Sequence, residues 1–161
     1  MHISTVLPGT AVRRRLLALL ACVPLGGSLA LAATAAEVKV LAAPAFQPVV
    51  AAVAPAFEKR TGNKVVVISD TVDALAARIR SGESFDLAVL PPAVLEALGQ
   101  EGAVSDGSII PLARDVAGAR NVYAGAVSTA SSNSPPALSM LILLANEETQ
   151  ALLKGKGLAA P

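Results

Sequence analysis

Short apolar runs alternate with longer segments of helical periodicity through the first two thirds of residues 37–161. Residues 38–43, 64–68 and 86–90 are almost entirely apolar, and each predicts a buried strand that a helical segment follows. This alternation predicts an α/β protein with a parallel sheet and right-handed crossovers. Because the runs do not alternate with polar residues, we expect helices to cover both faces of the sheet.

The three expected helices have clear start and stop signals. Pro48 suits the first position of the first helix, which should kink at Pro55 and end at residues 61–63, Thr-Gly-Asn. Residues 69–71, Ser-Asp-Thr, form a cluster of N-cap residue types before the second helix. Pro91-Pro92 opens the third helix.

Beyond Gly107 the pattern is weaker. Residues 108–120 have no clear period, and residues 122–127 predict a further strand. Residues 128–136 form a polar turn region, and residues 137–153 predict one helix. We expect the apolar face of this helix to contain Leu138, Leu141, Ile142, Ala145 and Leu152.

The first 36 residues have the pattern of a secretory signal peptide. Basic residues 13–15 precede an apolar stretch over residues 16–31, and small residues follow at 32–36. We expect cleavage after Ala36. An uncleaved membrane anchor is a weaker alternative, because a Pro and two Gly residues interrupt the apolar stretch. A lipoprotein processing site at Cys22 is a second alternative.

Composition excludes several classes of chemistry from the chain that remains after cleavage. His2 and Cys22 are the only histidine and cysteine, and both lie in the signal segment. We therefore expect no imidazole-based triad, thiol nucleophile or zinc site, and no cofactor. With 13 basic and 12 acidic residues and 2% aromatic residues, the chain has no feature that favours nucleic-acid binding. Serine or carboxylate chemistry stays open on composition alone.

Eight short segments within residues 37–161 together follow the pattern of a known family. They are residues 38–43, 75–79, 85–90, 102–104, 112–114, 122–128, 144–150 and 156–158. In order and spacing they resemble the molybdate-binding-protein-like branch of bacterial extracellular solute-binding proteins, the receptors of ABC importers. The resemblance implies one lobe of a type II periplasmic binding protein fold, a three-layer sandwich with a mostly parallel sheet. It also implies a periplasmic location.

The second lobe of that family has no counterpart in this chain. Members of the family leave the first lobe after the segment that matches Arg114 and return near the segment that matches Val122. Only seven residues separate these two positions here, so a join lies near Arg120-Asn121. The expected organisation is a signal peptide (1–36) and a single lobe (37–161), with an N-terminal part (37–120), a C-terminal return segment (121–161) and the second lobe missing between them.

The resemblance also implies a ligand site at the starts of two helices, where hydroxyls and backbone N–H groups hold an oxyanion. The candidate ligand-binding residues are Ala43, Pro44 and Ala45 after the first strand, and Ser69, Thr71 and Val72 before the second helix. Thr71 keeps a hydroxyl of the family pattern, but Asp70 and Asp73 stand where the family has glycine. At ~5 Å and an effective dielectric of ~20, each carboxylate would disfavour a bound anion by about 3 kcal/mol. The plainer interpretation of residues 69–71 is a helix N-cap.

The sequence thus favours a periplasmic substrate-binding component of an ABC importer, shortened to one lobe. Its expected partners are a small, molybdate-like anion, bound weakly or no longer bound, and a permease in the inner membrane. The alternative is a shortened copy without transport function, which folds as a lone lobe or associates with itself without binding ligand. A secreted enzyme is the least favoured class, because no histidine or cysteine would remain.

Overall fold

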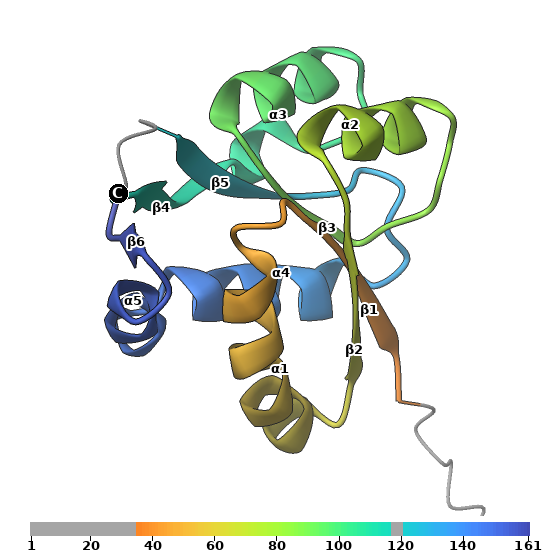
Figure 1. Cartoon of the computed structure of the whole chain (residues 1–161). Helices are drawn as coiled ribbons and strands as arrows, with labels where there is room; N and C mark the ends of the chain where they lie inside the picture. Colours follow the sequence, from red (N-terminus) through yellow and green to blue (C-terminus); the bar gives the residue numbers. More distant parts are fainter. Residues whose placement is uncertain (1–34, 117–120) are drawn as a thin grey trace, which may run out of the picture. The chain divides into compact units, whose positions relative to one another are not determined.

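The computed structural model describes residues 35–116 and 121–161, so residues 1–34 of the expected signal peptide and Arg120 lie outside the described residues. The elements, labelled in Figure 1, are β1 (Glu37–Ala42), α1 (Gln47–Thr61), β2 (Lys64–Ser69), α2 (Val72–Arg80), β3 (Leu87–Leu90), α3 (Pro92–Gln100), the short 3-10 helix η1 (Asp106–Ser108), β4 (Ile110–Asp115), β5 (Val122–Val127), α4 (Ser134–Ala145), α5 (Glu147–Lys154) and β6 (Leu158–Ala159). In this part of the chain, no helix is long and apolar enough to cross a membrane.

The described strands form one sheet with the order β2-β1-β3-β5-β4-β6. β1 pairs in parallel with both β2 and β3, whereas β5 is antiparallel to β3 and β4, and β6 is antiparallel to β4. The sheet is therefore mixed, and the expectation of a mostly parallel sheet is wrong. The connection between β4 and β5 spans only residues 116–121. A parallel pair needs a crossover of about a dozen residues or more, so these two strands form an antiparallel hairpin.

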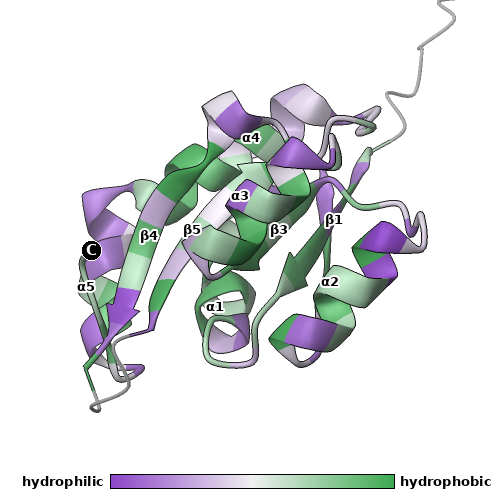
Figure 2. Cartoon of the chain, turned by 90° about the horizontal axis from the view of Figure 1, so that it is seen from above, coloured by the Kyte–Doolittle hydropathy of each residue, from purple (hydrophilic) through white to green (hydrophobic). Residues whose placement is uncertain are grey.

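Helices cover both faces of the sheet, which confirms the α/β class and the three layers. α2 and α3 pack together on one face, and α1, α4 and α5 contact one another on the other face (Figure 1). Every residue of β3 is buried, as are the last three residues of β1. In Figure 2, β3 and much of β4 carry the hydrophobic colouring. The apolar runs of β1 and β3 thus correspond to strands that are covered from both sides, whereas β2, which was also expected to be buried, lies at the edge of the sheet and has no fully buried residue.

The helix ends in the first half of the lobe follow the sequence signals. α1 ends at Thr61, and Gly62 has a φ of 74°, a left-handed conformation in which its N–H donates to the carbonyl of Glu58. Thr71 is the N-cap of α2, and α3 begins at Pro92. These residue types define the ends locally, so the predicted boundaries are confirmed here.

The sequence pattern missed β4, because Pro111 lies inside it. Proline cannot donate to a ladder, so its presence argues against a central strand. The β4–β5 register shifts between Pro111 and Ala113, and β6 pairs with β4 only at Arg114 and Asp115. Near Pro111, β4 is therefore paired on one side only among the described residues, and the missing N–H is tolerated.

The single helix predicted over residues 137–153 is two helices that meet at Asn146. This residue has an extended ψ of 152°, and its side chain accepts a hydrogen bond from the N–H of Glu148 at the start of α5. The predicted apolar face is also partly wrong: Leu141 is buried, whereas Leu138, Ile142 and Leu152 are exposed. α4 is apolar almost all round, so its periodicity does not identify the face that Ala137, Met140, Leu141 and Leu144 bury.

Candidate functional site

The six predicted ligand-binding residues lie at one edge of the sheet. β1 and β2 are parallel and in register from Glu37↔Lys64 to Ala42↔Ser69, so their carboxyl ends are neighbours. Ala43, Pro44 and Ala45 lie in the turn from β1 to α1. Ser69 ends β2, Thr71 lies in the turn that follows, and Val72 begins α2. We call this end of the strands the carboxyl edge of the sheet, as distinct from its edge strands. In open α/β sheets, ligands bind outside the carboxyl ends of parallel strands.

The first turn offers few free donors. Ala43 is buried, and its N–H donates to the carbonyl of Val89 at 2.9 Å, which extends the β1–β3 ladder. The carbonyl of Ala43 accepts from the N–H groups of Phe46 and Gln47 at 2.9 and 3.1 Å. Pro44 has no N–H. Of the three candidates in this turn, exposed Ala45 therefore has the backbone donor best placed for a ligand.

Phe46 anchors the first turn to the sheet. Its side chain is fully buried, and its ring lies 6.2 Å from the ring of Tyr123 in β5, centroid to centroid. Tyr123 is 7% exposed and packs in the core. Burial raises the pKa of its phenol, with a further contribution from the charge of Asp115. The contact holds the turn after β1 against the middle of the sheet.

In the second turn, Thr71 caps α2. Its Oγ1 accepts a hydrogen bond from the N–H of Ala74 at 3.3 Å, so the N-cap interpretation is confirmed. Its N–H donates to Oδ1 of Asp70 at 2.8 Å and is not free for a ligand. The hydroxyl of Thr71 can still donate its proton. The N–H groups of Val72 and Asp73 begin the helix and have no acceptor within it.

Asp70 belongs to a group of ion pairs with Arg78, Glu83 and Lys39. Its Oδ2 lies 3.7 Å from Nη1 of Arg78, and Arg78 also binds Glu83, with Nε–Oε2 at 2.5 Å. Nζ of Lys39 in β1 approaches Oε1 of Glu83 at 2.8 Å. The hydrogen bonds from Arg78 and then Lys39 lower the pKa of Glu83 to about 2. Arg78 thus offsets part of the negative charge that Asp70 brings to the carboxyl edge.

The hairpin between β4 and β5 also turns at the carboxyl edge. The N–H of Asp115 donates to the carbonyl of Asn121 at 2.8 Å, and Arg114 pairs with Val122. Val116 is 64% exposed and Val122 is 38% exposed. A hollow of about 480 Å³ lies here, lined by Arg114, Asp115, Val116, Val122 and Ala159. The place where the sequence predicted a missing lobe is therefore a short hairpin with apolar side chains on its surface.

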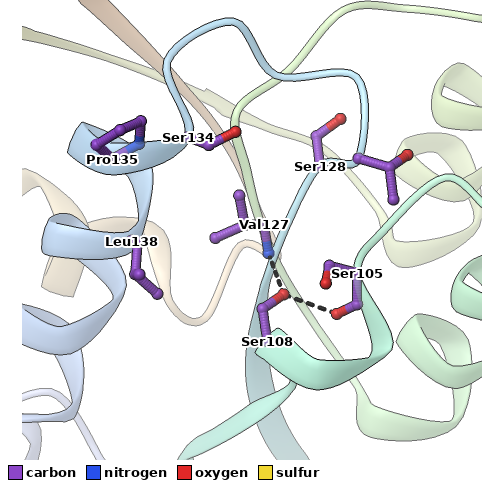
Figure 3. A pocket seen from close by; sticks show the side chains of 8 residues that line it. Ser105, Ser108, Val127, Ser128, Ser134, Pro135 and Leu138 are labelled. Atoms are coloured by element: carbon purple, nitrogen blue, oxygen red, sulfur yellow. Dashed lines mark hydrogen bonds between the residues drawn. The ribbon is translucent and has the colours of Figure 1, made fainter.

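A second hollow, of about 590 Å³, lies at the opposite edge of the sheet (Figure 3). Its lining residues are Ser105, Ser108, Val127, Ser128, Thr129, Ser134, Pro135 and Leu138. Oγ of Ser108 donates to the carbonyl of Ser105 at 2.7 Å and accepts from the N–H of Val127 at 2.9 Å (Figure 3). Sequence reasoning did not predict a site here, because the lining comes from separate parts of the chain: the segment around η1, the end of β5 with the loop that follows, and the start of α4. The lining is uncharged, and its Ser108 hydroxyl is engaged in holding the loops together.

Asp86 has a structural role beside this hollow. It is 7% exposed, and its Oδ2 accepts the N–H of Lys39 at 2.9 Å. Its Oδ1 accepts the hydroxyl of Ser131 at 2.5 Å. The carboxylate therefore ties the loop after β5 to β1, as a buried charge with its hydrogen bonds satisfied. Within residues 35–116 and 121–161, no cluster of metal-ligating side chains is present.

Three solved structures share this fold at low sequence identity. The substrate-binding domain of a proposed molybdenum ABC transporter from Clostridium difficile superposes with a TM-score of 0.71 at 12% identity, over 79% of this chain and 100% of that chain. The periplasmic molybdate-binding protein of Azotobacter vinelandii gives 0.69 at 13% identity, over 78% and 100%. The sulfate-binding protein SubI of Mycobacterium tuberculosis gives 0.64 at 11% identity, over 78% and 87%.

The sequence itself matches a family. Among curated proteins no significant match is found. The family model described as bacterial extracellular solute-binding protein matches residues 38–119, which include β1 to β4 and both turns of the carboxyl edge. The chain therefore belongs to the bacterial extracellular solute-binding proteins, as the eight sequence segments indicated.

Proposed function

We propose that this chain is the solute-binding component of an ABC importer and captures a small oxyanion at the carboxyl edge, with molybdate as the first candidate. The observation that carries the proposal is the pairing of two turns, residues 43–46 and 69–72, at the ends of two parallel strands in register. Family membership supports a receptor role. The similar proteins from A. vinelandii and M. tuberculosis bind molybdate and sulfate, respectively.

The proposed site would hold the anion through neutral donors and the fields of two helices. α1 and α2 both begin at this edge, and a helix N-terminus carries a partial positive charge of roughly half a unit. The donors would be the N–H groups of Ala45, Val72 and Asp73 and the hydroxyl of Thr71. Ala43, Pro44 and Ser69 would shape the site. Binding of this kind requires no covalent step and no cofactor, so we do not propose an enzyme.

Three further proposals concern export of the chain, its missing lobe and its partner in the membrane. We propose that residues 1–36 direct export to the periplasm and are removed after Ala36. We also propose that the hairpin between β4 and β5 replaces the second lobe of the family, and that an inner-membrane ABC permease receives the solute. A site at the edge of a single lobe leaves most of a small ligand in contact with water, so its affinity should be weak.

Thermal unfolding with and without molybdate, tungstate and sulfate tests the oxyanion role. A ligand present at 100 times its dissociation constant stabilises a protein by about 2.7 kcal/mol. We expect one of these anions to raise the melting temperature. The variant Thr71→Asp should abolish the increase, because aspartate still caps α2 but adds a negative charge at the proposed site.

The matched control is Ser105→Asp, which adds the same charge at the opposite edge of the sheet. This variant should keep the response to the anion. If both variants respond like the unsubstituted chain, the anion binds elsewhere and the proposed site is wrong.

The alternative is a shortened copy that folds but does not transport. Specific contacts favour it: the N–H groups of Ala43 and Thr71 are already engaged within the chain, Pro44 has none, and Asp70 and Asp73 carry negative charge near the site. This alternative predicts cooperative unfolding that none of the three anions changes.

A further inference from the structure

β2 is an open edge of the sheet. Among the described strands it is hydrogen-bonded only to β1, and its sequence from Lys64 to Ser69 contains no proline, glycine or bulge. Val66 in its centre is 37% exposed. Native proteins usually cover or interrupt such an edge, since it can template pairing with another strand. We propose that β2 pairs antiparallel with β2 of a second copy of this chain.

The hydrogen-bonding directions along β2 favour this pairing. The N–H of Lys64 donates to the carbonyl of Ala36 on the β1 side, at 2.9 Å. Because N–H and C=O directions alternate along a strand, those of Val65, Val67 and Ser69 point away from β1. The outward N–H of Val65 is bound by Oε1 of Glu58 at 2.9 Å, and pairing with Ser69 of a second copy would replace this contact. The outward groups of Val67 and Ser69 are positioned for a further strand.

The side chains fix one register for two copies. Residues 64, 66, 68 and 70 share one face of the strand, and in order they are Lys, Val, Ile and Asp. A twofold axis at Val67 would place two copies of Val67 in a hydrogen-bonded pair. It would also place Lys64 opposite Asp70 of the second copy, and Val66 opposite Ile68. This sequence is self-complementary when antiparallel, with an aliphatic centre and opposite charges at both ends.

Lys64 and Asp70 can exchange their present partners within the chain for each other in the dimer. Nζ of Lys64 lies 3.6 Å from Oε2 of Glu58, and Oδ2 of Asp70 lies 3.7 Å from Nη1 of Arg78. The Lys64 side chain is 69% exposed and that of Asp70 is 43% exposed. Such pairs contribute little to stability and can rearrange. Self-complementarity therefore favours a second copy over an unrelated strand as the partner.

The pairing uses Ser69 and Asp70, which border the proposed oxyanion site, but it leaves the donors of Ala45, Thr71, Val72 and Asp73 unused. In an antiparallel pair of sheets, the two carboxyl edges point in opposite directions, so neither copy would close the site of the other. Loss of dimerisation and loss of anion binding can therefore be measured separately, the first as mass in solution and the second as a shift of the melting temperature.

Sedimentation velocity of the full chain over a range of micromolar concentrations tests the proposal. We expect a monomer–dimer equilibrium that Val67→Pro shifts to the monomer. Proline removes an outward N–H but none that serves β1, so the sheet should stay intact, which circular dichroism will verify. A monomer at all concentrations for the unsubstituted chain would overturn the proposal.

Charge exchange provides the second test. Lys64→Glu would place like charges opposite each other twice per dimer, and should raise the dissociation constant by roughly tenfold. Adding Asp70→Lys to this variant should restore the dimer, whereas Lys154→Glu, the same change on α5, should have no effect. A dimer that survives both Val67→Pro and Lys64→Glu must use another surface, such as exposed Val116 and Val122, and would overturn the proposal.

Discussion

Thr71 serves the fold and the proposed ligand site through different atoms. Its Oγ1 accepts from the N–H of Ala74, so the hydroxyl proton is not needed for capping. The N–H of Thr71 donates to Asp70, so the turn has one backbone donor fewer for an anion. The hydroxyl was predictable from the sequence, but the direction of the Asp70 carboxylate was not, because it depends on Arg78 one helix length away.

A single residue, Glu83, makes the free energy of unfolding depend on pH. Its pKa falls from an ordinary value of 4.5 to about 2 because Arg78 and Lys39 donate hydrogen bonds to it. A carboxyl with a lowered pKa in the folded chain stabilises it fully above the ordinary pKa, and this contribution disappears as pH falls toward 2. Denaturant unfolding between pH 5 and about 2 should therefore show falling stability, less steep in Glu83→Gln. Equal slopes for the two proteins would contradict this assignment.

Packing between elements depends on the missing side chain of Gly125 in β5. A Cβ at this position would collide with Cδ1 of Leu141 in α4 and lie 3.1 Å from Cδ1 of Leu112 in β4. Gly125→Ala should therefore destabilise the lobe by about 1–3 kcal/mol, through overpacking of the core. The measurement is the midpoint of urea unfolding.

Gly155→Ala provides the control for the same chemical change. Gly155 has a φ of −71°, and its nearest neighbour to an added Cβ is the carbonyl of Leu152 at 3.7 Å. This variant should be as stable as the unsubstituted chain or slightly more stable. If the two alanine variants lose the same stability, close approach at Gly125 is not the cause.

Elements whose signals are local were predictable, and elements that depend on distant partners were not. The first three strands and helices follow from apolar runs and capping residues. β4 was missed because Pro111 is acceptable only where no further strand pairs on its open side. The antiparallel β5 and the division of the last helix at Asn146 also depend on how the return segment meets the first half. The loops around Ser105 and Ser128 join only in the folded chain.

At the scale of the whole molecule, the chain is a receptor-like lobe with two exposed features, the carboxyl edge and the edge strand β2. The carboxyl edge combines two helix starts with the apolar residues Val116 and Val122 of the hairpin. The β2 edge lies at the side of the sheet, and pairing there would leave the carboxyl edge open to solvent. If the proposed loss of the second lobe is correct, the solute is held from one side only, and closure of two lobes around it cannot contribute to affinity.

The most direct test of the proposed oxyanion site is the amide NMR spectrum of the isotope-labelled chain during a titration with molybdate. We predict that the shifts concentrate on the amides of Ala45, Thr71, Val72 and Asp73 and saturate with a single weak dissociation constant. A spectrum that does not change, or changes centred on Ser105 and Ser128 at the opposite edge, would contradict an oxyanion site at the carboxyl ends of β1 and β2.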